Sequence, residues 1–199
     1  ERQVLPIVKD VPVICSVNGT DPTRVMPIFL RQIVAAGFSG VNNFPTVGLI
    51  DGNFRAALEQ TGMGYDREVA MIADAHAQDI FTMAYAFNAD ESRRMAAAGC
   101  DLLLAHVGLT AGGSIGASQT MSLEAAADLV GEMADAAKAV NPEILVLCHG
   151  GPIAEPSDVE AVLKRVPIHG FVGASSMERL PVERGIRETT AAFAAIKLP

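Results

Sequence analysis

The chain has 199 residues, of which 50% are hydrophobic, 5% are aromatic and 19% are charged. This length and composition suit one well-buried α/β domain and are too small for two full-sized domains. The formal net charge is −8, and the lysine and arginine residues form no run. Nucleic acid is therefore not expected as a partner, because it would require a clustered basic face.

Cys15, Cys100 and Cys148 stand far apart in apolar surroundings. Their odd number argues for a reducing compartment without structural disulfides. No apolar run approaches the roughly 18 residues of a membrane span, and no secretory signal pattern opens the chain. We therefore expect a cytoplasmic protein with no membrane partner. Because the first residue is Glu1 rather than Met, we also expect a processed or truncated N-terminus.

Strand-like runs alternate with helical patterns along the whole chain. In chain order, the predicted elements are strand 11–17, helix 22–36, strand 40–44, helices 53–60 and 66–78, strand 80–87, helix 89–98, strand 101–107, helix 122–140, strand 143–149, helix 157–166, strand 170–174 and helix 182–196. Most of these strands lack polar alternation, which is typical of strands covered on both faces in a parallel sheet.

Helix boundaries are predicted from capping residues. Asp21 is expected to cap the first helix, with Pro22 at its first position. Ser122 and Ser157 are expected at two later N-termini, the second with Glu160 at the capping-box spacing.

Two architectures fit this alternation: a doubly wound open sheet, and a TIM (β/α)8 barrel that lacks its first two βα units. A complete barrel needs about 250 residues. The start on a residue other than Met favours the shortened barrel, and no Gly-x-Gly-x-x-Gly follows the first strand, which counts against a dinucleotide fold. We predict a single TIM-barrel domain over residues 1–199 that is incomplete at its N-terminus.

Small residues follow the last two predicted strands. They are Gly150, Gly151, Gly173, Ser175 and Ser176. In TIM barrels the loops after the last two strands are where phosphate groups usually sit. Glycines let the backbone approach an oxyanion, and serine hydroxyls add donors. The alternative is that small residues merely close tight turns. We expect these residues to bind a small phosphorylated or carboxylated molecule.

His106 and His149 each stand at a strand end, immediately before a glycine. A neutral imidazole there can hydrogen-bond a carboxylate or carbonyl, or transfer protons near pH 7. The alternative is that each ring is held by a backbone carbonyl beneath the loops. We predict that both are catalytic, whereas His76 and His169 are expected to be structural.

Glu178 and Arg179 follow the last of the small-residue turns. The planar fork of arginine suits a carboxylate or phosphate, so Arg179 is a candidate for substrate binding, and Glu178 is a candidate acid or base. The alternative is a weak ion pair at a helix N-terminus. Cys148 alternates to the opposite side of the strand from His149 and is expected in the core rather than as a nucleophile.

Polar residues also follow the earlier strands. Asn18 and Asn43 are expected to hydrogen-bond a ligand oxygen. Asp21 is the candidate Mg²⁺ ligand, because Mg²⁺ takes only one or two protein carboxylates, with helix capping as the alternative. Residues 45–65 read as a lid or a subunit interface. The glycine-rich residues 110–116 read as a gate or as a cradle for an anion, and they are not a P-loop.

Five strings in order carry a resemblance to a known family. They are VNNFPTVGLIDG over 41–52, EQTGMGY over 59–65, AHVGLTAGGSIG over 105–116, LCHGGPIA over 147–154 and GASSMERLP over 173–181. The sequence resembles the phosphoenolpyruvate hydrolase-like family, whose members are also described as TIM-barrel signal-transduction proteins. The C-terminal domain of Tm-1-like proteins is similar in the same strings.

The resemblance implies a barrel of the phosphoenolpyruvate/pyruvate superfamily, with two further βα units at its start. It also implies lyase, mutase or hydrolase chemistry on C3–C4 oxyacids, usually with Mg²⁺. The first hypothesis is therefore a hydrolase or lyase acting on phosphoenolpyruvate, phosphonopyruvate or a related oxyacid. The second is a ligand-sensing module without catalysis, and the third is an assembly domain that uses residues 45–65. A homo-oligomer is expected.

Overall fold

The computed structural model describes residues 1–197, and its contacts group into two compact units. The first unit combines Glu1–Ala105 with Glu132–Val146, and the second combines His106–Gly131 with the chain from Leu147 onward. Each unit is therefore assembled from two separate stretches of the chain. The single-domain organisation stays a prediction.

Every predicted strand is present, with shorter ends. The strands are β1 (Ile14–Ser16), β2 (Gly40–Asn42), β3 (Phe81–Ala86), β4 (Leu102–His106), β5 (Leu145–His149) and β6 (Gly170–Phe171). They form a six-stranded sheet in the order β1-β2-β3-β4-β5-β6. The described pairs are parallel, with Ile14 opposite Gly40 and Leu147 opposite Gly170.

The strand order distinguishes the two predicted architectures. A doubly wound sheet reverses its strand order at a switch point, whereas this order follows the chain. The parallel α/β fold is confirmed, and the doubly wound alternative does not fit. The closed barrel and its two further N-terminal units stay predictions.

Every predicted helix is present as well. The helices are α1 (Met26–Ala35), α2 (Gly52–Gln60), α3 (Tyr65–His76), α4 (Ala89–Ala97), α5 (Leu123–Lys138), α6 (Pro156–Arg165) and α8 (Leu180–Ala194). Two short elements were not predicted: the 3-10 turn η1 (Val47–Leu49) and the helix α7 (Ser175–Glu178).

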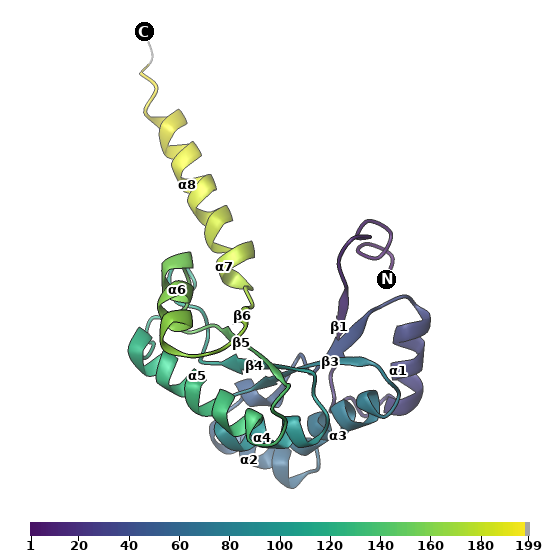
Figure 1. The fold of residues 1–199 in the computed structure, drawn as a ribbon. Helices are drawn as coiled ribbons and strands as arrows, with labels where there is room; N and C mark the ends of the chain where they lie inside the picture. Colours follow the sequence, from purple (N-terminus) through teal and green to yellow (C-terminus); the bar gives the residue numbers. More distant parts are fainter. Residues whose placement is uncertain (198–199) are drawn as a thin grey trace. The chain divides into compact units, whose positions relative to one another are not determined.

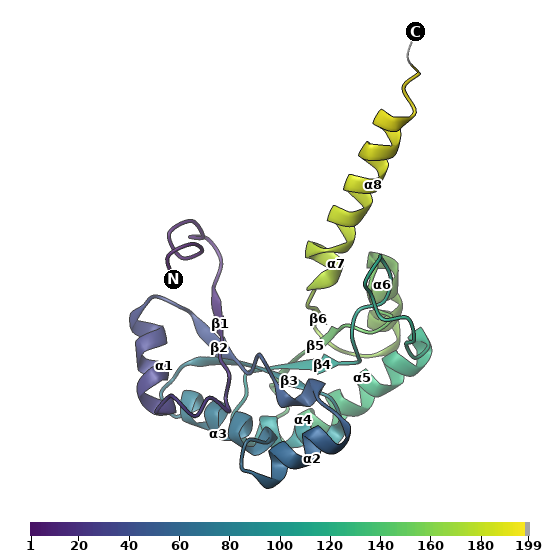
Figure 2. The same ribbon diagram turned by 180° about the vertical axis from the view of Figure 1, so that it is seen from behind.

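The first unit has its core between β3 and the helices that follow the strands. Both α3 and α4 pack against β3, and α1 packs against α3, as Figures 1 and 2 show from opposite sides. Ile72 of α3, Met95 of α4 and Ala84 of β3 are completely buried. Apolar residues of the helices therefore cover the strands, as the helical periodicity of the sequence requires.

Two predicted helix caps are wrong. Asp21 and Pro22 lie before α1, which begins at Met26, because the Asp21 carboxylate accepts hydrogen bonds from the backbone N–H and hydroxyl of Thr23 instead. The α6 helix begins at Pro156, before the predicted Ser157.

Acidic side chains replace the predicted serine at the start of α6. Glu155 is its N-cap, and Asp158, rather than Glu160, accepts the backbone N–H of Glu155 at 2.8 Å. The predicted cap at Ser122 is confirmed, since its hydroxyl accepts the N–H of Ala125 at 3.2 Å.

The second unit ends in α8, which continues directly from α7 (Figure 2). Leu180 is the one buried residue within α8. Val182, Ile186 and Phe193 are 55%, 64% and 71% exposed, although they are apolar. Within residues 1–197, no helix is long and apolar enough to cross a bilayer.

Candidate functional site

The second unit brings His106 and His149 together. His106 ends β4 and His149 ends β5, and their ring centroids lie 4.8 Å apart at an interplanar angle of 58°. Both side chains are buried, at 6% and 7% exposure. The two histidines at equivalent strand ends therefore lie side by side, and their catalytic roles stay predictions.

Hydrogen bonds assign opposite tautomers to the two rings. The Nδ1 of His106 accepts the backbone N–H of Gly108 at 3.1 Å, so its proton is on Nε2. The Nδ1 of His149 lies 2.7 Å from the carbonyl oxygen of Val172, which only accepts, so His149 is protonated on Nδ1 and its Nε2 is the basic nitrogen. One ring has an N–H at Nε2 and the other has a lone pair there.

Burial keeps both rings neutral at pH 7. Desolvation, followed by the nearby His149, lowers the pKa of His106 to about 4. Desolvation also lowers the pKa of His149, against the opposing effect of the Val172 carbonyl. A neutral buried histidine acts as a hydrogen-bond donor or as a base, and not as a cation.

The turn at Gly150 and Gly151 packs tightly against the loop after β4. A Cβ on Gly150 would lie 2.2 Å from the Gly108 carbonyl oxygen, and one on Gly151 would lie 2.5 Å from that of Val107. Both glycines also have positive φ, at 81° and 57°. Close packing alone thus requires glycine at both positions, which is the alternative raised from the sequence.

The contact between the two loops occupies the backbone amide of Gly151, which was expected to bind the ligand. The N–H of Gly151 donates to the carbonyl of Gly108 at 2.7 Å, and the carbonyl of Gly151 accepts the N–H of Ala111 at 2.9 Å. An anion would have to displace the Gly108 carbonyl to reach the Gly151 amide. The binding roles of Gly150 and Gly151 stay predictions.

The second small-residue turn leaves the neighbouring strand, as expected. Cys148 pairs with Phe171, so the turns after β5 and β6 start side by side. Ser175 begins α7, and Gly173 lies against Met177, where a Cβ would come within 2.4 Å of its Cγ. This turn is therefore the entry to a helix.

Ser176 lines a pocket of about 490 Å³ whose other walls include Phe171, Met177 and Pro181. Glu155, Glu160 and Arg184 also line this pocket, so charged and apolar side chains share its walls. The binding roles of Gly173, Ser175 and Ser176 stay predictions.

Glu178 and Arg179 differ in their surroundings. Glu178 is exposed, and its catalytic role stays a prediction. Arg179 is half-buried and donates to the Gly112 carbonyl at 3.1 Å and to the Glu183 carboxylate at 2.9 Å. Glu183 also accepts the N–H of Ser114 at 2.7 Å. Arg179 therefore holds the glycine-rich loop against α8, a contact that the sequence did not indicate.

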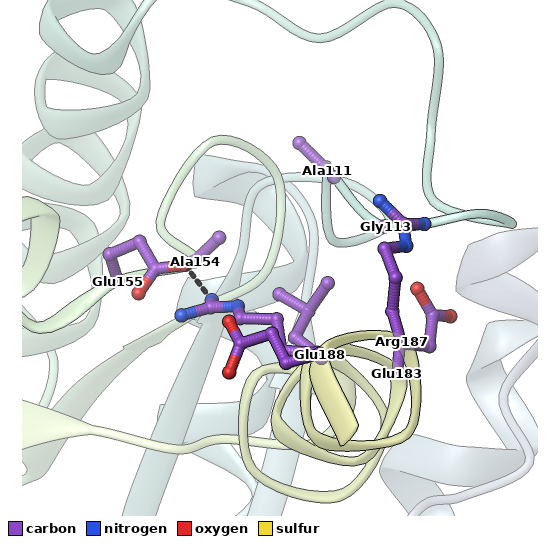
Figure 3. A pocket seen from close by; sticks show the side chains of 10 residues that line it. Ala111, Gly113, Ala154, Glu155, Glu183, Arg187 and Glu188 are labelled. Atoms are coloured by element: carbon purple, nitrogen blue, oxygen red, sulfur yellow. Dashed lines mark hydrogen bonds and ion pairs between the residues drawn. The ribbon is translucent and has the colours of Figure 1, made fainter. Parts of the chain in front are cut away.

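A charged pocket of about 480 Å³ lies beside this loop (Figure 3). Its lining comes from three of the strings that carry the family resemblance, from Glu155 and from one face of α8. The residues are Ala111, Gly112, Gly113, Ala154, Glu155, Leu180, Glu183, Arg184, Arg187 and Glu188. Arg184 pairs with Glu155 across it. The arginines of α8 were missed because they read as solvent-facing residues of a terminal helix.

Cys148 is fully buried, and desolvation raises the pKa of its thiol to about 11. A thiol with so high a pKa is a poor nucleophile. The prediction that Cys148 belongs to the core is confirmed.

Asn43 and Glu68 form a buried network in the first unit. Both side chains are completely buried. The side-chain amide of Asn43 donates to Glu68 Oε2 at 2.6 Å and to the Tyr85 carbonyl at 3.1 Å, while its oxygen accepts the Tyr85 N–H at 2.7 Å. Glu68 Oε1 accepts the N–H of Val47 at 2.8 Å. Asn43 thus joins two strand ends and α3 in the interior, and its ligand-binding role stays a prediction.

Glu68 was missed by the sequence reasoning. It lies in the charged first turn of α3, where an exposed side chain is normal. Desolvation raises its pKa from 4.5 to about 7, although the side chains of Thr46 and Asn43 and the Val47 N–H oppose the shift. Glu68 also lies close to Gly19, where a Cβ would be 2.9 Å from the Cα of Glu68. The sequence does not show this contact, because the two residues are far apart in the chain.

Asn18 and Asp21 form local turns after β1. Asn18 is exposed and accepts the N–H and hydroxyl of Thr20 at 3.1 and 2.8 Å. One Asp21 oxygen is taken by Thr23, and the other lies 3.8 Å from Arg24. The role of Asn18 in ligand binding and that of Asp21 as a Mg²⁺ ligand stay predictions. No group of three or more metal-ligating side chains occurs within residues 1–197.

Comparison with known proteins identifies relatives of this sequence. The phosphoenolpyruvate hydrolase-like family matches residues 1–196. The chain is 54% identical over 198 residues to the ToMV susceptible protein tm-1(GCR26) and 53% identical to the ToMV resistance protein Tm-1(GCR237), both of Solanum lycopersicum. Each match covers 99% of this chain and 26% of the tomato protein, so the chain spans about a quarter of the length of these relatives.

Among solved structures, a phosphonopyruvate hydrolase complex with oxalate and Mg²⁺ is 11% identical with a TM-score of 0.42, over 92% of this chain and 80% of that chain. At this level of similarity, the ligand and the metal of that structure say nothing about what this chain binds. The match over residues 1–196 shows that the chain belongs to the phosphoenolpyruvate hydrolase-like family, as its five strings predicted.

Proposed function

We propose that this chain contains the acid–base groups of an enzyme that hydrolyses or cleaves phosphoenolpyruvate, phosphonopyruvate or a related small oxyacid. Family membership supports this class of substrate. The observation that carries the proposal is the pair of buried, neutral histidines with opposite tautomers. Such a pair offers a donor and a base at a short distance, which acid–base catalysis requires.

The two rings have different roles in this proposal. The Nε2–H of His106 donates to a carboxylate or enol oxygen of the substrate, because a ring with a pKa of about 4 is neutral at pH 7. The Nε2 of His149 accepts the proton of the attacking water, since its Nδ1–H is held by Val172. For phosphoenolpyruvate, water oxygen bonds to phosphorus as its proton passes to His149, and the bond from phosphorus to the enol oxygen breaks to release inorganic phosphate. The proton held by His149 is then returned to the enolate carbon to give pyruvate.

Mg²⁺ is part of the proposal through the family resemblance alone, and no step is assigned to it. The assay therefore compares reactions with added Mg²⁺ and with a chelator. The expected result for a metal-dependent enzyme is loss of turnover with the chelator and recovery on adding Mg²⁺.

The proposal is tested by phosphate release from phosphoenolpyruvate and phosphonopyruvate with the full-length protein. We expect His149→Ala to lower kcat by about 10²- to 10⁴-fold, which is the usual loss for a general base. His76→Gln, on the exposed surface of α3, is the control and should retain activity. No turnover above the His149→Ala protein with either substrate would refute the proposal.

The pH profile gives a second readout. Activity requires neutral His149, and burial lowers its pKa from the ordinary 6.5. The acid limb of kcat/KM should therefore lie below pH 6.5. An acid limb above that value would contradict the role of His149 as the base.

A further inference from the structure

The glycine-rich loop over residues 110–116 had two readings from the sequence, a gate or an anion cradle. Contacts on both sides of Gly113 argue against a free gate. Arg179 binds the Gly112 carbonyl, and Glu183 binds the Ser114 N–H, so the loop is tied to α8 on either side of the glycine. The Ser114 N–H, and after it Arg179, lower the pKa of Glu183 and keep this anchor ionised. The loop is thereby a fixed wall of the charged pocket.

Most of the charges that line this pocket are already matched. Arg184 pairs with Glu155, and Glu183 pairs with Arg179. Arg187 differs, since within residues 1–197 its guanidinium has no ion pair or hydrogen bond. Figure 3 shows Arg187 rising from α8 on the side of Gly113.

The backbone of the loop adds donors on the same side. Gly112 and Gly113 line the pocket and have φ values of 80° and 73°, a conformation that favours glycine. In the part of the chain that the structure describes, neither amide donates a hydrogen bond. A Cβ on Gly113 would lie 2.3 Å from Arg179 and 2.4 Å from Glu183, so a side chain there would disturb the anchor.

We propose that the charged pocket is an anion-binding site in which Arg187 and the amides of Gly112 and Gly113 hold a carboxylate or phosphate group. This inference rests on the proposed function for its choice of ligand, because the small oxyacids proposed there carry carboxylate and phosphate groups. The arginine fork forms two parallel charge-assisted bonds to such a group. The fixed loop lowers the ordering cost of binding, since the hydrogen bonds of Arg179 and Glu183 to its backbone already hold it in place.

Glu188 allows a second test of the site, in which the substitution should strengthen anion binding instead of weakening it. Its carboxylate also lines the pocket and has no ion pair within residues 1–197. Its negative charge repels an anionic ligand at close range. Replacing it with glutamine removes this repulsion and keeps the size of the side chain.

Equilibrium binding of inorganic phosphate and phosphoenolpyruvate, measured by calorimetry on the full-length protein, tests the inference without requiring turnover. Arg187→Gln should weaken binding of both about 10- to 100-fold, which is the effect of losing a charge-assisted pair. Glu188→Gln should tighten it by up to about 10-fold. Arg31→Gln, on exposed α1, removes the same charge elsewhere and should change binding less than about twofold.

Circular dichroism of each variant checks that α8 and the rest of the fold are retained. Equal binding by Arg187→Gln and the unaltered protein would overturn the anion site, and so would an equal loss with Arg31→Gln. The outcome is separable from the proposed reaction. Binding that depends on Arg187, together with no phosphate release from any substrate, would keep the site and refute the enzyme.

Discussion

The buried carboxyl of Glu68 predicts an unusual pH dependence of stability. Burial raises its pKa from 4.5 to about 7, so between these values the native state holds a proton that the unfolded chain has released. The stability contributed by this carboxyl is therefore present below pH 4.5 and lost as the pH rises through 7. Since one pKa unit corresponds to about 1.36 kcal/mol, the free energy of unfolding should fall by about 2–3 kcal/mol from pH 5 to pH 8 through Glu68 alone.

Other titrating groups oppose this trend. The pKa of His106 is lowered to about 4, so the stability it contributes is present above 6.5 and is lost as the pH falls. His149 acts in the same direction. The stability of the unaltered protein thus combines opposite trends, and a variant is needed to isolate Glu68. The groups that act on Glu68 from its neighbours are Asn43, Thr46, Val47, Arg55 and Tyr65.

Glu68→Gln is the appropriate variant because it keeps the shape and cannot ionise. Both carboxylate oxygens of Glu68 accept N–H groups, so one donor will face the glutamine NH₂ and lose its partner. This loss costs about 1–3 kcal/mol. At pH 5 the variant should be the less stable protein, and by pH 8 the difference should have moved about 2–3 kcal/mol in its favour.

The assay is urea unfolding of both proteins at pH 5, 6, 7 and 8, with far-ultraviolet circular dichroism as the probe. Glu160→Gln, exposed on α6, is the control and should follow the unaltered protein at every pH. A difference between Glu68→Gln and the unaltered protein that stays constant from pH 5 to pH 8 would refute the reasoning, since it would mean that Glu68 ionises at its ordinary pKa.

Further predictions concern packing and thiols. Gly151→Ala should lower the free energy of unfolding by at least about 1–2 kcal/mol, because its Cβ would meet the Val107 carbonyl at 2.5 Å with φ at 57°. Gly185→Ala, with nothing within 4 Å, should raise it by roughly 0.5–1 kcal/mol. Thermal melts measure the stability of both variants. Equal changes in melting temperature for the two variants would contradict the close contact between Gly151 and the Val107 carbonyl. Iodoacetamide at pH 8 should leave Cys100 and Cys148 unmodified until urea is added, since burial raises their pKa to about 12 and about 11. Rapid labelling in the native protein, seen by mass spectrometry, would contradict this.

The fold was predictable because its signals are local. Apolar runs such as 101–107 are buried strands, and the segments with helical periodicity between the runs are helices. The errors came from competing local contacts. Asp21 was expected to cap α1, but its hydrogen bonds to Thr23 form a turn that ends before the helix.

The candidate site was predictable only in part. The places of His106 and His149 at strand ends were predictable, whereas the contact between their rings is shown by the structure. Glu68 and Arg187 were not predictable, because each reads as a charged residue on a helix surface. Their environments depend on contacts from distant parts of the chain, such as the approach of Gly19 to Glu68.

The terminal helix α8 has a consequence for local dynamics. Beyond Leu180 its residues other than Glu183 are exposed, and its ion pairs to the rest of the unit end at Arg184. An isolated helix of about 12–15 residues is only marginally stable in water. Amide protons from Ile186 to Ala194 should therefore exchange with deuterium quickly, while those of β4 exchange slowly. Binding of an anion at Arg187 would slow amide exchange in the first part of this segment. Exchange in α8 would therefore show whether the anion site is occupied.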